Sequence, residues 1–141
     1  MTVMPPIDLR LLSRTRGVLP QIMQSELAEC GLACIAMIAR YHGHDVDMLA
    51  LRRKFPGSLK GVDLARLVEM AAALDLSARA LRIELNDLKR VQGPCILHWD
   101  LDHFVVLKQA TRSGIVIHDP GFGVRSLTWD EASRSFTGIA L

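Results

Sequence analysis

A nearly continuous apolar helix is the feature that most restricts how this chain can fold. Residues 30–41 read CGLACIAMIARY, and their apolar side chains cover almost the whole circumference of a helix. A helix that is apolar on all sides has to be buried. Arg40 is its only charged residue and lies near the C-terminal end, where a cation is favoured. Since Gly43 is a natural stop, we expect residues 30–41 to form the central helix of a globular domain.

Length and composition fit one domain with a hydrophobic core. The chain has 141 residues, of which 50% are hydrophobic, and its 17 basic and 15 acidic residues leave a net charge of +2. Such a balance argues against nucleic acid as the main partner. Residues 1–20 lack the apolar region of a signal peptide, and the longest apolar run, residues 31–39, is far shorter than the roughly 20 residues of a membrane span. We therefore expect a soluble chain.

Periodicity places helices first and strands afterwards. Pro5-Pro6 opens an N-terminal arm over residues 1–20, in which residues 8–13 can form a short helix. This order favours an α+β fold, with N-terminal helices packed on an antiparallel sheet. The expected elements after the central helix are helices at 47–54 and 62–74, a strand at 78–83, a short helix or turn at 86–90, strands at 95–99, 103–109, 114–118 and 124–127, a helix from 128 to about 136, and a last edge strand at 137–141.

Cys30 is the candidate nucleophile, because it begins the apolar helix. The positive end of a helix and a neighbouring imidazolium both favour a thiolate. Glu29 opposes this by its charge, unless its side chain caps the helix or points to solvent. A buried, inert cysteine is the alternative for Cys30, and Cys34 and Cys95 are more simply read as small packed hydrophobes. Three cysteines without a framework spacing indicate free thiols in a reducing compartment.

His103 and Asp119 are the candidate partners of this thiol. His103 opens one predicted strand and Asp119 closes the next, so a hairpin centred near Thr111 brings them opposite or nearly opposite each other. The carboxylate would then orient the imidazole and stabilise its charged form. A slip of one residue would put the two side chains on opposite faces of the sheet, and the sequence does not fix the register.

Other polar residues admit further interpretations. Gln24 can supply an amide donor for an oxyanion, together with the backbone N–H of Cys30, or it is an ordinary loop residue. A zinc site from two pairs, Cys30 with Cys34 and Cys95 with His98, is disfavoured, because neither spacing is that of a usual zinc knuckle. Three other histidines are read as turn or packing residues: His42, His44 and His118.

Three separated motifs resemble the C39 peptidase domains of bacteriocin-processing ABC transporters, most closely the colicin V secretion type. They are the run from Gln24 through Cys30-Gly31 to Gly43, the run HWDLDHFVVL at 98–107, and HDPGFG at 118–123. The resemblance covers residues 21–141, which we take as the peptidase domain. Asp75 departs from the family, whose members tend to have Gly at this helix end; Asp tolerates a left-handed cap better than most residues.

The resemblance implies a papain-like cysteine peptidase that cuts a leader peptide after a Gly-Gly pair, so that a transporter can export the cargo. Cys30 would be the nucleophile, His103 the general base and acid, Asp119 the orienting group and Gln24 the oxyanion-hole amide. The domain itself would need no cofactor. The full-length transporter would add transmembrane helices and an ATPase domain that uses ATP, and would place this domain on the cytoplasmic side of the bacterial inner membrane.

Two rival functions use the same residues differently. One is a non-catalytic module that only docks the cargo leader, against which the presence of Cys30, His103 and Asp119 together argues. The other is an acyltransferase, which differs from a hydrolase only in the acceptor. A leader helix could lie on an apolar face that includes Leu64, Leu67 and Val68, although we favour these residues as core.

Overall fold

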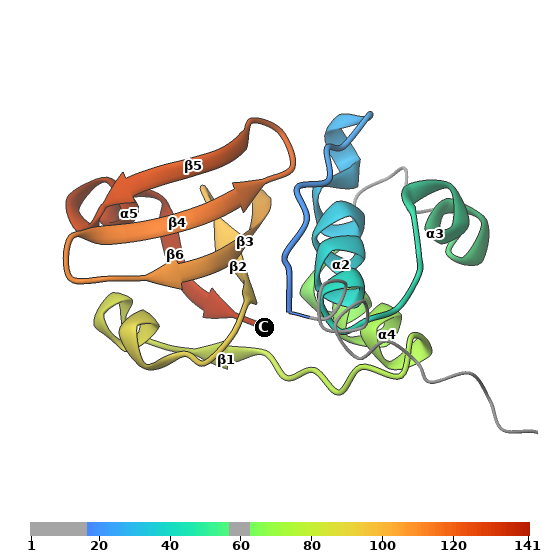
Figure 1. The fold of residues 1–141 in the computed structure, drawn as a ribbon, viewed down its shortest axis with the longest axis horizontal. Coiled ribbons are helices and arrows are strands. Elements are labelled where there is room, and N and C mark those ends of the chain that lie inside the picture. Colours follow the sequence, from blue (N-terminus) through green and yellow to red (C-terminus); the bar gives the residue numbers. More distant parts are fainter. Residues whose placement is uncertain (1–16, 57–62) are drawn as a thin grey trace, which may run out of the picture.

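A helical half and a sheet half make up the fold. The computed structural model describes residues 17–56 and 63–141. In Figure 1, helices α2, α3 and α4 lie on one side of the molecule and the strands on the other, with α2 next to the sheet. The helical elements are the 3-10 turn η1 (Leu27–Glu29), α2 (Cys30–Tyr41), α3 (Met48–Lys54), α4 (Leu64–Ala73), the 3-10 turn η3 (Leu85–Arg90) and α5 (Trp129–Ser135).

The strands of the described residues form one six-stranded antiparallel sheet, in the order β1-β6-β2-β3-β4-β5. This confirms the expected α+β class with helices packed on an antiparallel sheet. The strands are β1 (Leu81–Arg82), β2 (Cys95–Trp99), β3 (His103–Ala110), β4 (Gly114–Asp119), β5 (Gly123–Thr128) and β6 (Phe136–Ala140).

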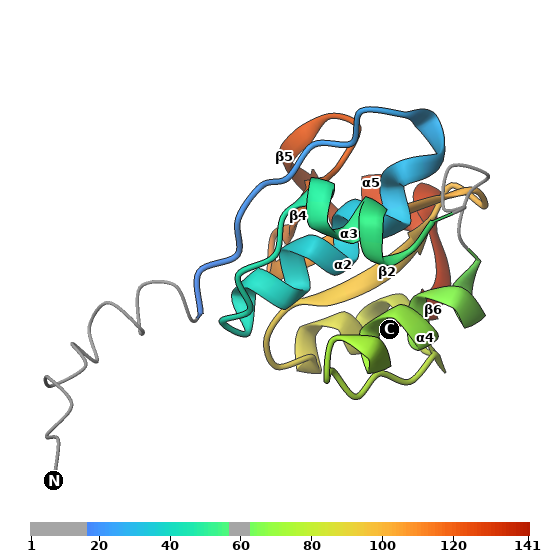
Figure 2. The same cartoon turned by 90° about the vertical axis from the view of Figure 1, so that its right-hand side faces the viewer.

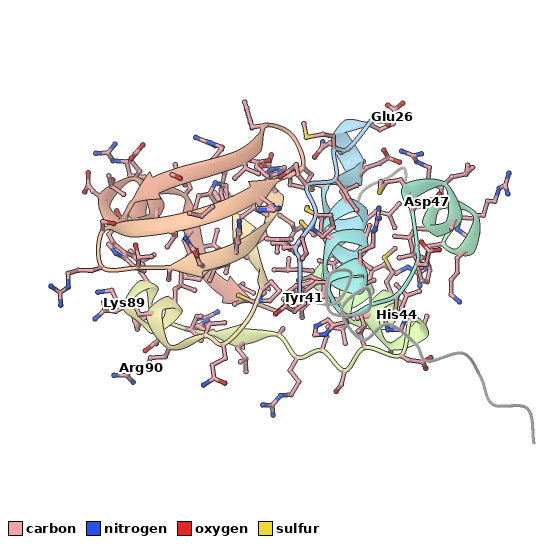
Figure 3. The ribbon with its side chains drawn as sticks, in the orientation of Figure 1. Glu26, Tyr41, His44, Asp47, Lys89 and Arg90 are labelled. Atoms are coloured by element: carbon pink, nitrogen blue, oxygen red, sulfur yellow. The ribbon has the colours of Figure 1, made fainter. Side chains whose placement is uncertain are left out.

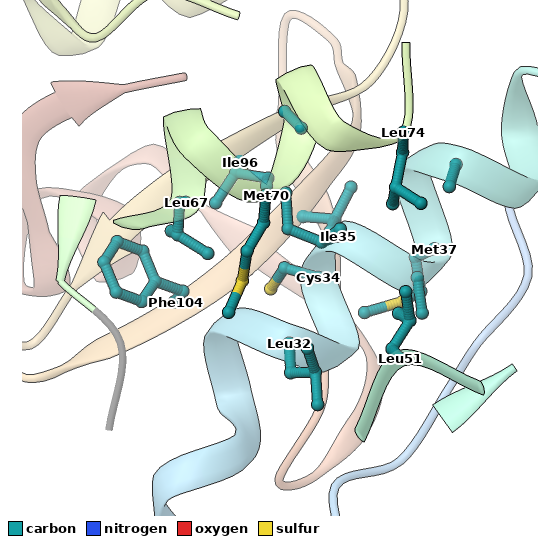
Figure 4. Packing of buried hydrophobic residues seen from close by; sticks show 14 of the residues in the cluster. Leu32, Cys34, Ile35, Met37, Leu51, Leu67, Met70, Leu74, Ile96 and Phe104 are labelled. Atoms are coloured by element: carbon teal, nitrogen blue, oxygen red, sulfur yellow. The ribbon is translucent and has the colours of Figure 1, made fainter. Parts of the chain in front are cut away.

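Helix α2 is buried as its composition requires. Leu32, Ala33 and Cys34 have no exposed surface, and Ile35 is 1% exposed. Figure 4 shows α2 packed against Leu67 and Met70 of α4 on one side. The other helices begin at side-chain caps. Asp47, labelled beside α3 in Figure 3, accepts from the backbone N–H of Ala50 at 2.8 Å, and Thr128 accepts from that of Glu131 at 3.1 Å.

Two cores share the central strands. The first contains α2, α3 and α4 together with Ile96, Phe104 and Val106. The second lies on the opposite face of the sheet, where Val105 and Leu107 pack with η3 and α5. Because successive side chains of a strand point to opposite faces, β3 serves both cores. Figure 2, turned by 90°, shows α2, α3 and α4 in front of the strands.

Two of the expected elements were wrong in part. The strand expected at 78–83 is reduced to Leu81–Arg82, because only these two residues pair with β6. The segment 137–141 is not an edge strand: β6 lies between β1 and β2 and pairs with both. Strand order depends on contacts far apart in sequence, which local alternation does not encode. The helix expected at 8–13 and residue 62 lie outside the described residues.

Most other details of the helical half agree with the predictions. The helix expected at 62–74 spans Leu64–Ala73, with Asp63 as its N-cap. Leu67 has no exposed surface and Leu64 packs against the first core, so both are core residues as favoured, whereas Val68 is half-buried and belongs to neither core. Asp75 adopts the left-handed conformation expected of it, with φ of 60°.

Candidate active site

Cys30 lies at the junction between η1 and α2, and it is 7% exposed. Its backbone is already helical, with φ of −58° and ψ of −43°, so η1 runs directly into α2. The thiol therefore projects from the N-terminal end of a helix, where the positive end of the helix dipole favours a thiolate.

His103 and Asp119 meet at the ends of β3 and β4. The imidazole Nε2 lies 2.7 Å from Asp119 Oδ1, and the carboxylate is 1% exposed. The same oxygen accepts from the Gly121 backbone N–H at 2.9 Å, and the Arg125 guanidinium lies 3.7 Å from Oδ2. Although burial acts against the charged carboxylate, these hydrogen bonds and positive charges lower the pKa of Asp119.

The register of the hairpin brings the two residues to one face of the sheet. Val106 pairs with His118, so continuing the ladder puts Asp119 opposite Val105, two residues from His103 and on the same face. This pairing puts the centre of the hairpin one residue beyond Thr111, the residue near which the sequence placed it. A β-bulge between Leu107 and Gln109 changes the register within this hairpin. As expected, His103 and Asp119 are nearly opposite.

The Cys30 thiol also lies close enough to the His103 imidazole to act on its pKa. Burial acts against the charged ring, but the hydrogen bonds and negative charges of Asp119 and Cys30 outweigh it and raise the pKa of His103 to about 9. Because Nε2 is held by Asp119, Nδ1 is the nitrogen left for the thiol. The thiol, the imidazole and the carboxylate thus lie together in one group.

Gln24 is held beside this group by an N-terminal segment, residues 17–24. In Figure 1 this segment runs between the sheet and α2. The backbone N–H of Gln24 donates to Pro120 O at 2.9 Å, and its side-chain Nε2 donates to Glu26 O at 3.0 Å. A Cβ built on Gly121 would lie 3.8 Å from both Gln24 Oε1 and His103 Cε1. The structure therefore brings Gln24 to the same place as His103 and Asp119.

Sequence reasoning missed the contacts that hold residues 17–24. The Gln21 side chain donates to Asp119 O at 3.0 Å, and His118 Nδ1 lies 2.9 Å from Pro20 O. His118 is 3% exposed and points away from Asp119, which confirms its expected packing role and adds a hydrogen bond to it. No local pattern pairs residues that are 98 positions apart.

Glu29 and Arg52 form a second feature that the sequence did not reveal. The Glu29 carboxylate has no exposed surface and is bound by the Arg52 guanidinium at 2.5 and 2.9 Å. It also accepts from the backbone N–H groups of Ser25 and Glu26, as part of a capping box for η1. Glu29 therefore neither caps α2 nor points to solvent, the two arrangements expected of it; its carboxylate caps the preceding turn η1 and is paired with Arg52.

Neither of the remaining thiols is a candidate nucleophile. Burial raises the pKa of Cys34 well above its ordinary value and that of Cys95 to about 12, which makes both poor nucleophiles. His98 Nδ1 lies 2.8 Å from Thr137 Oγ1. Within residues 17–56 and 63–141, no three His, Cys, Asp or Glu side chains are grouped closely enough to hold a metal ion.

Comparison with known proteins places this geometry in a family. The sequence model of the peptidase C39 family matches residues 19–141. The chain belongs to the peptidase C39 family. Its solved relatives are papain-like, and the described helices and antiparallel sheet have the same architecture.

Curated C39 relatives include two proteins of Escherichia coli. The chain is 47% identical over 135 residues to the colicin V secretion/processing ATP-binding protein and 50% identical over 128 residues to the probable microcin-H47 secretion/processing ATP-binding protein. These matches cover 96% and 91% of this chain but 19% and 18% of the relatives. The chain therefore spans about a fifth of their length. Among the described residues, no helix is both long and apolar enough to cross a membrane.

Solved structures agree with this assignment. The double glycine motif protease from an AMS/PCAT transporter, crystallised in complex with the leader peptide, is 37% identical with a TM-score of 0.80, and the match covers 92% of this chain and 93% of that one. The peptidase domain of ComA, a bifunctional ABC transporter of Streptococcus, is 23% identical with a TM-score of 0.76, and the match covers 87% and 96% of the two chains. The second likeness supports the fold alone.

Proposed function

We propose that this chain is a cysteine endopeptidase that removes a double-glycine leader from a bacteriocin or microcin precursor. The observation that carries the proposal is the hydrogen bond between His103 and Asp119, with Gln24 beside it and with Cys30 close enough to act on the imidazole. The catalytic residues are Cys30 as nucleophile, His103 as general base and acid, Asp119 as orienting group and Gln24 as oxyanion donor.

The reaction proceeds through an acyl-enzyme. The Cys30 thiolate attacks the carbonyl carbon of the scissile peptide, and the resulting oxyanion accepts from the Cys30 backbone N–H and the Gln24 amide. The His103 imidazolium then protonates the leaving amine, which departs with the mature peptide. In the second half, His103 takes a proton from water, hydroxide attacks the thioester, and the leader leaves with a carboxylate. Asp119 stabilises the imidazolium whenever it is charged.

The substrate and its setting follow from the relatives. One solved relative is a double glycine motif protease bound to a leader peptide, and the curated relatives are secretion/processing ATP-binding proteins. We infer that a narrow cleft over Cys30 and Gln24 accepts only glycine at the two positions before the cut. The transmembrane and ATPase parts of a full-length transporter would hold this domain at the cytoplasmic face of the inner membrane and use ATP for export.

The test is mass spectrometry of a double-glycine leader peptide incubated with the domain. We expect one cut, directly after the second glycine, which Cys30→Ala abolishes. Cys95→Ala is the matched control, because it removes another thiol outside the site and should cut as the unchanged domain does. Replacing either substrate glycine by a larger residue should abolish cutting. An intact peptide that still binds would overturn the proposal in favour of a docking module.

A further inference from the structure

The carboxylate of Glu29 is an anion buried one residue before the candidate nucleophile. It has no exposed surface, and the Arg52 guanidinium binds both of its oxygens. Hydrogen bonding to Arg52 is the main reason that the pKa of Glu29 is lowered to about 2. The carboxylate is therefore charged at every pH at which a peptidase of this kind would work.

We propose that Arg52 is a positioning residue for the thiol chemistry of Cys30, and that it acts through Glu29. The inference rests on the proposed role of Cys30 as nucleophile. Arg52 reaches Glu29 from α3, an element that carries no catalytic residue, and its side chain is 33% exposed. Helix α3 is thereby tied to the turn that precedes the nucleophile.

The first effect of Arg52 is on charge. Glu29 is the residue before Cys30 in the chain. An uncompensated carboxylate there would disfavour the thiolate, because like charges repel each other. The bidentate guanidinium cancels that charge locally. Two titratable groups of the described residues interact with Cys30, namely His103 of β3 and Cys34 of α2, and Asp119 of β4 is bound to the imidazole. Changing Arg52 alters none of them directly.

The second effect is on geometry. Glu29 Oε1 accepts from the backbone N–H groups of Ser25 and Glu26 at 3.0 and 3.1 Å, and Arg52 also donates to Ser25 Oγ at 3.1 Å. These residues form the turn that joins Gln24 to Cys30. One carboxylate thus fixes the spacing between the proposed oxyanion donor and the nucleophile, and Arg52 holds that carboxylate in place.

The experiment combines two readouts on Arg52→Gln, Glu29→Gln and the double variant. The first is the pH midpoint for alkylation of Cys30 by iodoacetamide, followed by mass spectrometry; the second is kcat/KM for the double-glycine peptide. Arg52→Gln should raise the midpoint by about one pH unit and lower kcat/KM at pH 7 roughly tenfold, because Glu29 keeps its charge without a partner. The double variant should recover most of both losses. Glu29→Gln alone keeps an oxygen acceptor for the turn and should not raise the midpoint.

Arg53→Gln is the matched control, because Arg53 is the exposed neighbour on α3 and lies outside the ion pair. It should leave both readouts unchanged. An unchanged alkylation midpoint in Arg52→Gln, or a double variant as impaired as Arg52→Gln, would overturn the inference. If Arg52→Gln does not fold, a rise of the midpoint in Glu29→Gln overturns it instead. Alkylation needs no peptide cleavage, so failure of the proposed function would show separately, as an unchanged domain that does not cut.

Discussion

At the scale of single residues, the two ring nitrogens of His103 give the site its expected pH dependence. The partners Asp119 and Cys30 raise the pKa of His103 to about 9. Thiol proteolysis requires the imidazolium with the thiolate, so kcat/KM should fall as pH rises through about 9. Asp119→Asn removes the charge that favours the imidazolium and should move this alkaline limb towards pH 6.5, with a loss of at least tenfold at pH 8.

The measurement is kcat/KM for the leader peptide between pH 5 and 10, in both forms of the domain. The same pKa shift stabilises the fold. Since folding raises the pKa of His103, its stabilising effect is complete below about pH 6.5 and is lost as pH rises through about 9. An alkaline limb below pH 7 in the unchanged domain would contradict this assignment.

Asp75 gives a second test at the same scale, this time of stability. It follows the C-cap of α4 with φ of 60°, a conformation that costs most non-glycine residues about 1–2 kcal/mol. Asp75→Val should lower the free energy of unfolding by about 1–2 kcal/mol, because a β-branched side chain is poorly tolerated there. Asp75→Gly should leave it equal or higher. Urea unfolding of the three forms checks this, and equal stability of the Val and Gly forms would show that the left-handed backbone costs nothing.

Cys30, His103 and Asp119 could be predicted because each begins or ends a strongly patterned element. The partner of Glu29 could not. The sequence shows an acidic residue beside a candidate nucleophile, and it shows Arg52 as one of three consecutive basic residues at the end of a short helix. Only the packing of α3 against α2 brings the guanidinium to the carboxylate, 23 residues away. Buried ion pairs of this kind leave no periodic trace in a sequence.

At the scale of elements, local pattern predicted the helices and the hairpins, and tertiary pairing decided the rest. The limits of α2 and β2 agree with the expected ones, because their apolar runs are closed by clear turn residues. β6 was misplaced at an edge, since its half-buried residues pair with β1 and β2 across more than 35 residues of sequence. The β-bulge between Leu107 and Gln109 of β3 was not predicted either, because it depends on packing and leaves no local pattern in the sequence.

The N-terminal segment, residues 17–24, offers a prediction at this scale. It carries Gln24 and is held to β4 in part by the contact between His118 and Pro20 O. His118→Leu removes the donor at similar volume, so we expect roughly tenfold lower kcat/KM and faster proteolysis within the segment. Loss of one buried hydrogen bond should cost about 1–2 kcal/mol of stability.

His42→Leu is the matched control, because His42 lies exposed in the turn after α2. It should leave cleavage of the leader peptide unchanged. Equal activity of His118→Leu and the unchanged domain would mean that the other contacts of the segment suffice to place Gln24.

At the scale of the whole molecule, the site spans two cores that share strands. Cys30 belongs to the helical core, whereas His103 and Asp119 project from the sheet. Phe104 and Val106 of β3 complete the helical core, and Val105 and Leu107 of the same strand complete the other. Because β3 supplies side chains to both cores, unfolding of one half would remove contacts from the core of the other. We therefore expect a single cooperative unfolding transition.

Two probes separate the halves. Trp99 and Trp129 both lie in or against the sheet-side core, so tryptophan fluorescence reports that half, while far-UV circular dichroism reports mainly α2, α3 and α4. Urea transitions followed by the two probes, and by peptide cleavage, should share one midpoint. Val106→Ala should lower that midpoint for all three together, by about 1–2 kcal/mol of unfolding free energy, because Val106 is fully buried between α2 and the sheet. Separate midpoints would show that the helices and the sheet fold independently. The alignment of Cys30 with His103 would then depend on docking of the two halves, and binding of the leader peptide should stabilise the docked form.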